Sequence, residues 1–150
     1  RHLWKNRKLG IPWGEAGSVT DTSEAAQRAI VFAALCGDDY ETMAKQAYSN
    51  IKLTHRDRYI AGYSLSYALS VGSLINGVAL KDIRPQMIGF ANNPKIEPMI
   101  ASWDINQQIF NGSPGADPSI KISPIDACRL FGPNCTLGFL APAAFFATAQ

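Results

Sequence analysis

The stretch that decides the fold reads RYIAGYSLSYALSVGSLING and covers residues 58–77. Its large apolar side chains recur at steps of three and four, which is the spacing of one face of an α-helix. They are Ile60, Tyr63, Tyr67, Val71 and Leu74. A neighbouring stripe of small side chains would let another helix approach closely. It consists of Ala61, Ser64, Ala68 and Gly72. The pair Asn76-Gly77 then predicts the end of this helix.

Upstream of this stretch, the sequence predicts an earlier helix that begins near Thr22. Asp21 and Glu24 stand three residues apart, as in a capping box with Asp in the place of Ser or Thr. An alanine-rich apolar surface follows, and Gly37 is expected to end the helix in a left-handed conformation.

Further helices are expected on both sides of residues 58–77. Asp38 or Asp39 is expected to cap a helix that runs from Tyr40 to about Asn50. Weaker signals predict helices over residues 82–91, 98–110, 123–131 and 137–149, the third with Ser123 as its cap.

These patterns predict an all-α fold in one domain. The chain has 150 residues, of which 47% are hydrophobic and 17% charged, and this length suffices for one buried core. No sustained alternation of β-branched residues suggests a strand. We expect about seven helices in residues 20–150. Residues 1–19 should form an irregular basic arm, since four of the first eight residues are Lys or Arg.

Composition excludes several classes of protein. A net charge of +2 is too small for a strongly basic nucleic-acid module, and no apolar run reaches the roughly 18 residues of a membrane span. Three cysteines without a close pair favour a reducing cytoplasm, with a Cys128–Cys135 disulfide as the alternative. The chain starts without Met and ends in apolar residues, so we expect that it is a piece of a longer chain.

Two groups of residues are candidates for a binding site. His55 lies at an expected helix entrance, where free backbone N–H groups favour anions; alternatively, it caps the helix or hydrogen-bonds a neighbouring turn. The pair Asp38-Asp39 is compatible with a metal site, but helix capping also explains it. Mg²⁺ needs several convergent oxygens, which one local pair does not supply. The residues alone therefore predict no metal site.

Residues 14–77 resemble part of an ADP-ribosylglycohydrolase. The family's turn before an alanine-rich helix is matched by GSVTDTSEAAQRA at residues 17–29. GDDYETMA at residues 37–44 and LTH at residues 53–55 follow in the family's order. The long helix of Ala, Leu and aromatic residues is matched by residues 59–77.

The resemblance implies an all-α orthogonal bundle that hydrolyses an N- or O-glycosidic bond to ADP-ribose with bound Mg²⁺. It also implies an ADP-ribose pocket lined by the turn and by the histidine of Leu-Thr-His. Carried over position by position, these residues are Thr20, Asp21, Thr22, Ser23 and His55. A helix start that offers N–H groups, with a His donor nearby, suits a pyrophosphate and a ribose.

The chain also departs from the family's pattern. Ser23-Glu24 replaces an Asn-Gly pair, which puts a negative charge where a phosphate would approach. The motifs Thr-Asp-Asp-Thr and Asp-x-Asp-Thr, which hold the family's metals, do not occur in these 150 residues. Three hypotheses follow: a hydrolase whose metal ligands lie outside this sequence, a non-catalytic helical protein that binds ADP-ribose or a nucleotide or is purely structural, or an unrelated helical protein that shares Thr-His by chance.

Overall fold

The computed structural model describes residues 1–100, 123, 125–126 and 129 of this chain. These residues are largely helical and contain no β-strand. The α-helices are α1 (His2–Lys8), α2 (Glu24–Leu35), α3 (Tyr40–Thr54), α4 (Arg58–Ile75) and α5 (Ile83–Ala91). Two short 3₁₀ helices, η1 (Leu80–Asp82) and η2 (Glu97–Met99), flank α5. The all-α class is confirmed for the described part of the chain.

The number of about seven helices stays a prediction. Residues 101–110 and 137–149, where two of the predicted helices lie, are outside the described residues. The predicted cap at Ser123 is observed, because its Oγ accepts the backbone N–H of Asp126 at 3.1 Å.

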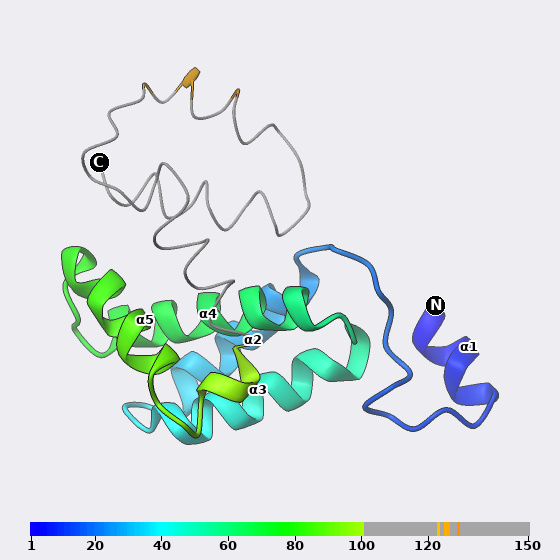
Figure 1. The fold of residues 1–150 in the computed structure, drawn as a ribbon. Helices are drawn as coiled ribbons and strands as arrows, with labels where there is room; N and C mark the ends of the chain where they lie inside the picture. Colours follow the sequence, from blue (N-terminus) through cyan, green and yellow to red (C-terminus); the bar gives the residue numbers. More distant parts are fainter. Residues whose placement is uncertain (101–122, 124, 127–128, 130–150) are drawn as a thin grey trace.

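α1 corrects the expectation that residues 1–19 are irregular. Residues 2–8 contain Leu, Trp, Lys and Arg but no Gly or Pro, and such residues favour a helix. Lys5, Arg7 and Lys8 in the last turn interact favourably with the negative end of the helix dipole. Figure 1 shows α1 apart from the bundle, joined to it by an extended segment, and α1 buries none of its residues.

The start of α2 differs from the predicted capping box. The helix begins at Glu24 rather than near Thr22, and Ser23 is its N-cap without a side-chain capping bond. The Thr22 Oγ1 atom instead lies 3.2 Å from His55 Nε2. Gly37 ends this region with a φ of 59°, as predicted.

α3 has the predicted start and a later end. Asp39 is the N-cap, and its carboxylate accepts the N–H of Thr42 at 3.0 Å. The helix continues past Asn50 to Thr54, and this extra turn makes His55 its C-cap residue.

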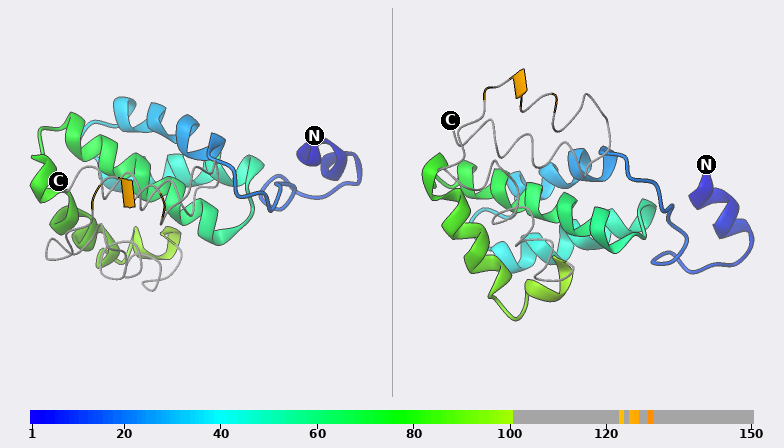
Figure 2. Two further views of the ribbon diagram at one scale, coloured as in Figure 1. Left: turned by 90° about the horizontal axis from the view of Figure 1, so that it is seen from above. Right: turned by 45° about the horizontal axis from the view of Figure 1, so that its top comes forward.

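α4 is the central helix and matches its predicted boundaries. Asp57 caps its start by accepting the N–H groups of Tyr59 at 2.8 Å and Ile60 at 3.1 Å. Asn76 is the C-cap, and Gly77 follows with a φ of 85°. α4 contacts α2, α3 and α5, so it joins the helices of the bundle (Figures 1 and 2).

The close contacts of α4 run through small side chains, as the sequence predicts. The small stripe of α4 is buried, and so are the alanines of α2 at positions 25, 29 and 33. A Cβ at Gly72 would lie 2.5 Å from Met43 Cε on α3. The large apolar face is less covered than expected, since Tyr67 is 37% exposed and Leu74 is 42% exposed.

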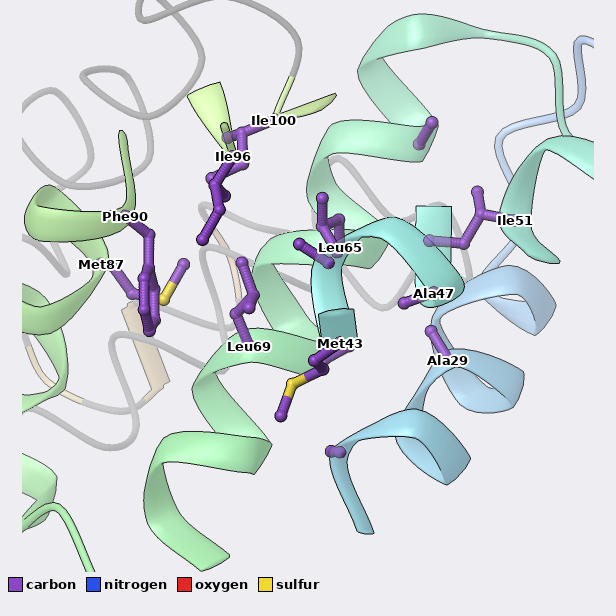
Figure 3. Close-up of a cluster of buried hydrophobic side chains, with 14 of the residues drawn as sticks. Ala29, Met43, Ala47, Ile51, Leu65, Leu69, Met87, Phe90, Ile96 and Ile100 are labelled. Carbon is purple, nitrogen blue, oxygen red and sulfur yellow. The ribbon is translucent and has the colours of Figure 1, made fainter. Parts of the chain in front are cut away.

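One apolar core joins the helices of the bundle (Figure 3). Side chains from α3 and α4 meet those of α5 and of the segment around η2. The largest members are Met43, Ile51, Leu65, Leu69, Ile83, Met87, Phe90, Ile96 and Ile100. Among the described helices, none has both the length and the apolar character required to span a bilayer.

The buried hydroxyl of Ser64 predicts a stabilising substitution. Ser64 is fully buried, and its Oγ has no hydrogen-bond partner in the part of the chain that the structure describes. Removing an unsatisfied buried hydroxyl removes its desolvation cost, so we expect Ser64→Ala to raise the free energy of unfolding by about 1–3 kcal/mol. Urea unfolding of both proteins measures this difference.

Ser73 on the same helix provides the matched control. It is also fully buried, but its hydroxyl donates to the Leu69 carbonyl oxygen at 2.9 Å. Ser73→Ala should therefore lower the free energy of unfolding by about 0.5–1.5 kcal/mol. A Ser64→Ala protein that is less stable than the wild type would contradict the expectation.

Candidate functional site

The candidate site lies where residues 16–23 cross the junction between α3 and α4. Ser18 forms a parallel bridge with His55. The Ser18 N–H donates to the Thr54 carbonyl oxygen at 2.6 Å, and the Arg56 N–H donates to the Ser18 carbonyl oxygen at 2.9 Å. Gly17 lies so close to this junction that a Cβ there would be 2.9 Å from the Thr54 carbonyl carbon. Backbone contact therefore fixes the segment on the bundle.

His55 lies between α3 and α4, two residues before Asp57, which is the N-cap of α4. It is also the C-cap of α3, and its N–H donates to the Ile51 carbonyl oxygen at 3.0 Å. The Asp57 side chain accepts the N–H groups of Tyr59 and Ile60 at the start of α4. The anion site at His55 stays a prediction.

The imidazole ring of His55 is enclosed by two threonine hydroxyls. The residue is only 5% exposed. Its Nε2 lies 3.2 Å from Thr22 Oγ1, and its Nδ1 lies 2.9 Å from Thr54 Oγ1. Both ring nitrogens thus have partners within the protein, as the alternative prediction for His55 requires.

One arrangement of protons satisfies all of these hydrogen bonds. Arg28 can only donate, and its Nη2 lies 2.6 Å from Thr54 Oγ1. The Thr54 hydroxyl can then donate to His55 Nδ1, which leaves the ring proton on Nε2, where it donates to Thr22 Oγ1. We assign this tautomer because it satisfies each hydrogen bond from Arg28 through Thr54 and His55 to Thr22.

The same arrangement keeps the ring neutral. Burial lowers the pKa of His55 below its ordinary value of 6.5, and the Arg28 charge acts in the same direction. Glu24 opposes these two effects without reversing them. The hydrogen bond from Thr22 is the main cause that lowers the pKa of the exposed Glu24 carboxyl. At neutral pH the site therefore holds a neutral imidazole between a cation and an anion.

The structure brings only part of the predicted pocket together. Thr22 contacts His55, whereas Thr20 and Asp21 are exposed. The Thr20 N–H donates to Ser18 Oγ at 3.1 Å, which shapes the turn.

Ser23 lies at the first turn of α2. Its hydroxyl accepts a hydrogen bond from Gln27 Nε2 at 3.3 Å, and it makes no capping bond to the α2 backbone. The start of α2 therefore lacks a side-chain cap, and Glu24 brings a carboxylate to it. The Ser23 hydroxyl, the Glu24 carboxylate and the backbone N–H groups at the start of α2 can form hydrogen bonds with polar groups of a ligand.

Sequence reasoning missed Arg28, Thr54 and Asn50. Arg28 Nε donates to Asn50 Oδ1 at 3.3 Å, and Arg28 Nη2 also reaches the Asn50 carbonyl oxygen at 3.4 Å. The spacing of Glu24 and Arg28 places both on one side of α2. It gives no sign that Arg28 joins α2 to the end of α3, because that contact depends on the packing of the two helices.

The described residues do not fit a magnesium site. Within residues 1–100 and the few described positions after them, no three side chains of His, Cys, Asp or Glu gather as metal ligands. Asp39 of the pair Asp38-Asp39 uses its carboxylate to cap α3. No chemical step through a metal can be derived from these residues.

Comparison with known proteins finds no matching family model, no matching curated protein and no matching solved structure. The likeness to ADP-ribosylglycohydrolases therefore depends on the motifs within residues 14–77. The contact between Thr22 and His55 joins two of these motifs in space.

The close approach at Gly17 predicts a destabilising substitution. A Cβ there would meet backbone atoms of residues 54–56 at 2.9–3.0 Å, and backbone cannot give way as a flexible side chain can. Gly17→Ala should lower the free energy of unfolding by about 1–3 kcal/mol, as overpacking does. Denaturant unfolding measures the change.

Gly89 in the last turn of α5 is the control for this substitution. A Cβ there would meet no atom of the described residues within 4 Å. Gly89→Ala should raise the free energy of unfolding by about 0.5–1 kcal/mol, because alanine is the better helix former. Equal effects at the two glycines would show that residues 54–56 do not require a glycine at position 17.

Proposed function

We propose that this chain recognises an ADP-ribosyl group at the start of α2 and belongs to a hydrolase of the ADP-ribosylglycohydrolase type. The observation that carries the proposal is the contact between Thr22 and His55, at 3.2 Å across 33 residues of sequence. The resemblance assigns these two residues to one pocket. A common pocket requires such proximity, and local sequence spacing does not produce it.

The groups at this surface have chemistry that suits ADP-ribose. The backbone N–H groups that begin α2 favour a phosphate, and the hydroxyls of Thr20 and Ser23 can pair with ribose hydroxyls. The Glu24 carboxylate disfavours a phosphate beside it, but it accepts hydrogen bonds from a ribose diol. In this proposal His55 holds Thr22 in place and does not itself touch the ligand.

Hydrolysis would require further groups. Mg²⁺-assisted attack by water needs carboxylate ligands that place the ion, and the described residues do not gather them. The residues around Thr22 would bind and orient the ADP-ribosyl group. A cytoplasmic location and an orthogonal arrangement of about seven helices belong to the same proposal.

One observation favours a second candidate, a non-catalytic helical protein in which this region is structural. Both nitrogens of the His55 ring are bonded within the protein, and the ring is almost fully buried. A histidine in this state stabilises the contact between residues 16–23 and α3 without any ligand. The two candidates differ in whether ADP-ribose binds.

Calorimetric titration of ADP-ribose separates these candidates. We expect the wild-type chain to bind, and Glu24→Gln to bind about fivefold more tightly, since removal of one nearby negative charge contributes about 1 kcal/mol. Glu97→Gln makes the same charge change on η2 and should leave the affinity unchanged. If ADP-ribose produces no heat with the wild type or with Glu24→Gln, the binding proposal is wrong and the structural candidate stands.

A further inference from the structure

Residues 16–23 are held to the bundle through a small set of contacts around His55. The bridge at Ser18 supplies two backbone hydrogen bonds, to Thr54 and from Arg56. The Thr22 side chain adds a bond to the His55 ring. We call the group Thr22, Arg28, Thr54 and His55 the His55 clasp. Figures 1 and 2 show that the chain beyond this point extends away from the bundle towards α1.

We infer that the His55 clasp is sensitive to acid: its neutral ring fastens residues 16–23 to the end of α3, and protonation of the ring releases this segment. In the neutral tautomer assigned above, Nδ1 accepts the Thr54 hydroxyl proton, while Thr54 Oγ1 accepts a hydrogen bond from Arg28. A proton added to Nδ1 would oppose that hydroxyl proton. The Thr54 hydroxyl would then lose its hydrogen bond to the ring, or turn so that its oxygen accepts from the ring and from Arg28 at once.

The charged groups around the ring also disfavour a second positive charge in the closed state. From α2, Arg28 repels a protonated ring, whereas Glu24 attracts it through an exposed carboxylate. At the α3–α4 junction, Lys52 donates to the Arg56 carbonyl oxygen at 2.7 Å, and Asp57 is used as the cap of α4.

Release of residues 16–23 from the bundle would remove the energetic cost of a positive charge on the buried His55 ring. In the closed state His55 is only 5% exposed, so water solvates a charge on its ring poorly. In the open state the ring is hydrated and regains its ordinary pKa of 6.5, whereas burial lowers the pKa in the closed state. The open state therefore binds more protons, so acid favours opening. Above pH 6.5 the closed state keeps its full stability, and below this value stability falls until the closed-state pKa is reached.

Amide hydrogen exchange at pH 7.5 and 5.0 tests the clasp. The N–H groups of Ser18 and Arg56 report on it because both bond across the bridge. After correction for intrinsic exchange, their protection should fall by up to about tenfold for each pH unit below 6.5. The far-ultraviolet dichroism should stay helical at both pH values, because the bundle remains folded.

Two variants make the test specific. In His55→Gln the amide can still donate to Thr22 but does not titrate, so the protection of Ser18 and Arg56 should no longer depend on pH. In Thr22→Val the segment loses its bond to the ring, so protection should already be lower than in the wild type at pH 7.5.

Four results would each overturn the inference, and three of them concern pH. They are pH-independent protection in the wild type, an unchanged pH dependence in His55→Gln, and loss of helical dichroism in parallel with loss of protection. Protection in Thr22→Val equal to the wild type would also contradict it. The clasp acts whether or not ADP-ribose binds, so a failed titration leaves these measurements decisive.

Discussion

The close approach of α4 to α2 and α3 is the constraint on which the rest of the structure depends. Small residues on α4 and α2 permit this approach, and a Cβ at Gly72 would lie 2.5 Å from the end of the Met43 side chain. This packing brings Arg28 on α2 within hydrogen-bonding distance of Thr54 at the end of α3. The orientation of the His55 ring follows from that contact, so the polar site is a product of apolar packing.

The elements that depend on neighbouring residues could be predicted from the sequence. Asp39 caps α3, and Asn76-Gly77 ends α4, since each signal acts within a few residues. The capping box at Asp21 and Glu24 failed for the opposite reason. The Thr22 side chain contacts His55, a partner 33 residues away that no local sequence pattern indicates.

The candidate site could be predicted only in part. The motifs named Thr22 and His55, and the structure joins them. The sequence did not predict that His55 also ends α3, because this depends on one additional helical turn beyond Asn50. Arg28 and Asn50 carried no signal of their own, because their contact exists only when the two helices are packed.

The narrow attachment at Ser18 has a mechanical consequence. A pulling force on the first residues would pass through the extended segment to the two backbone hydrogen bonds at this bridge and to the side chains beside them. These few bonds would break before the load reached the buried interfaces of α2, α3 and α4. Under tension the N-terminal segment would therefore detach at this junction first, while the helical bundle stays folded.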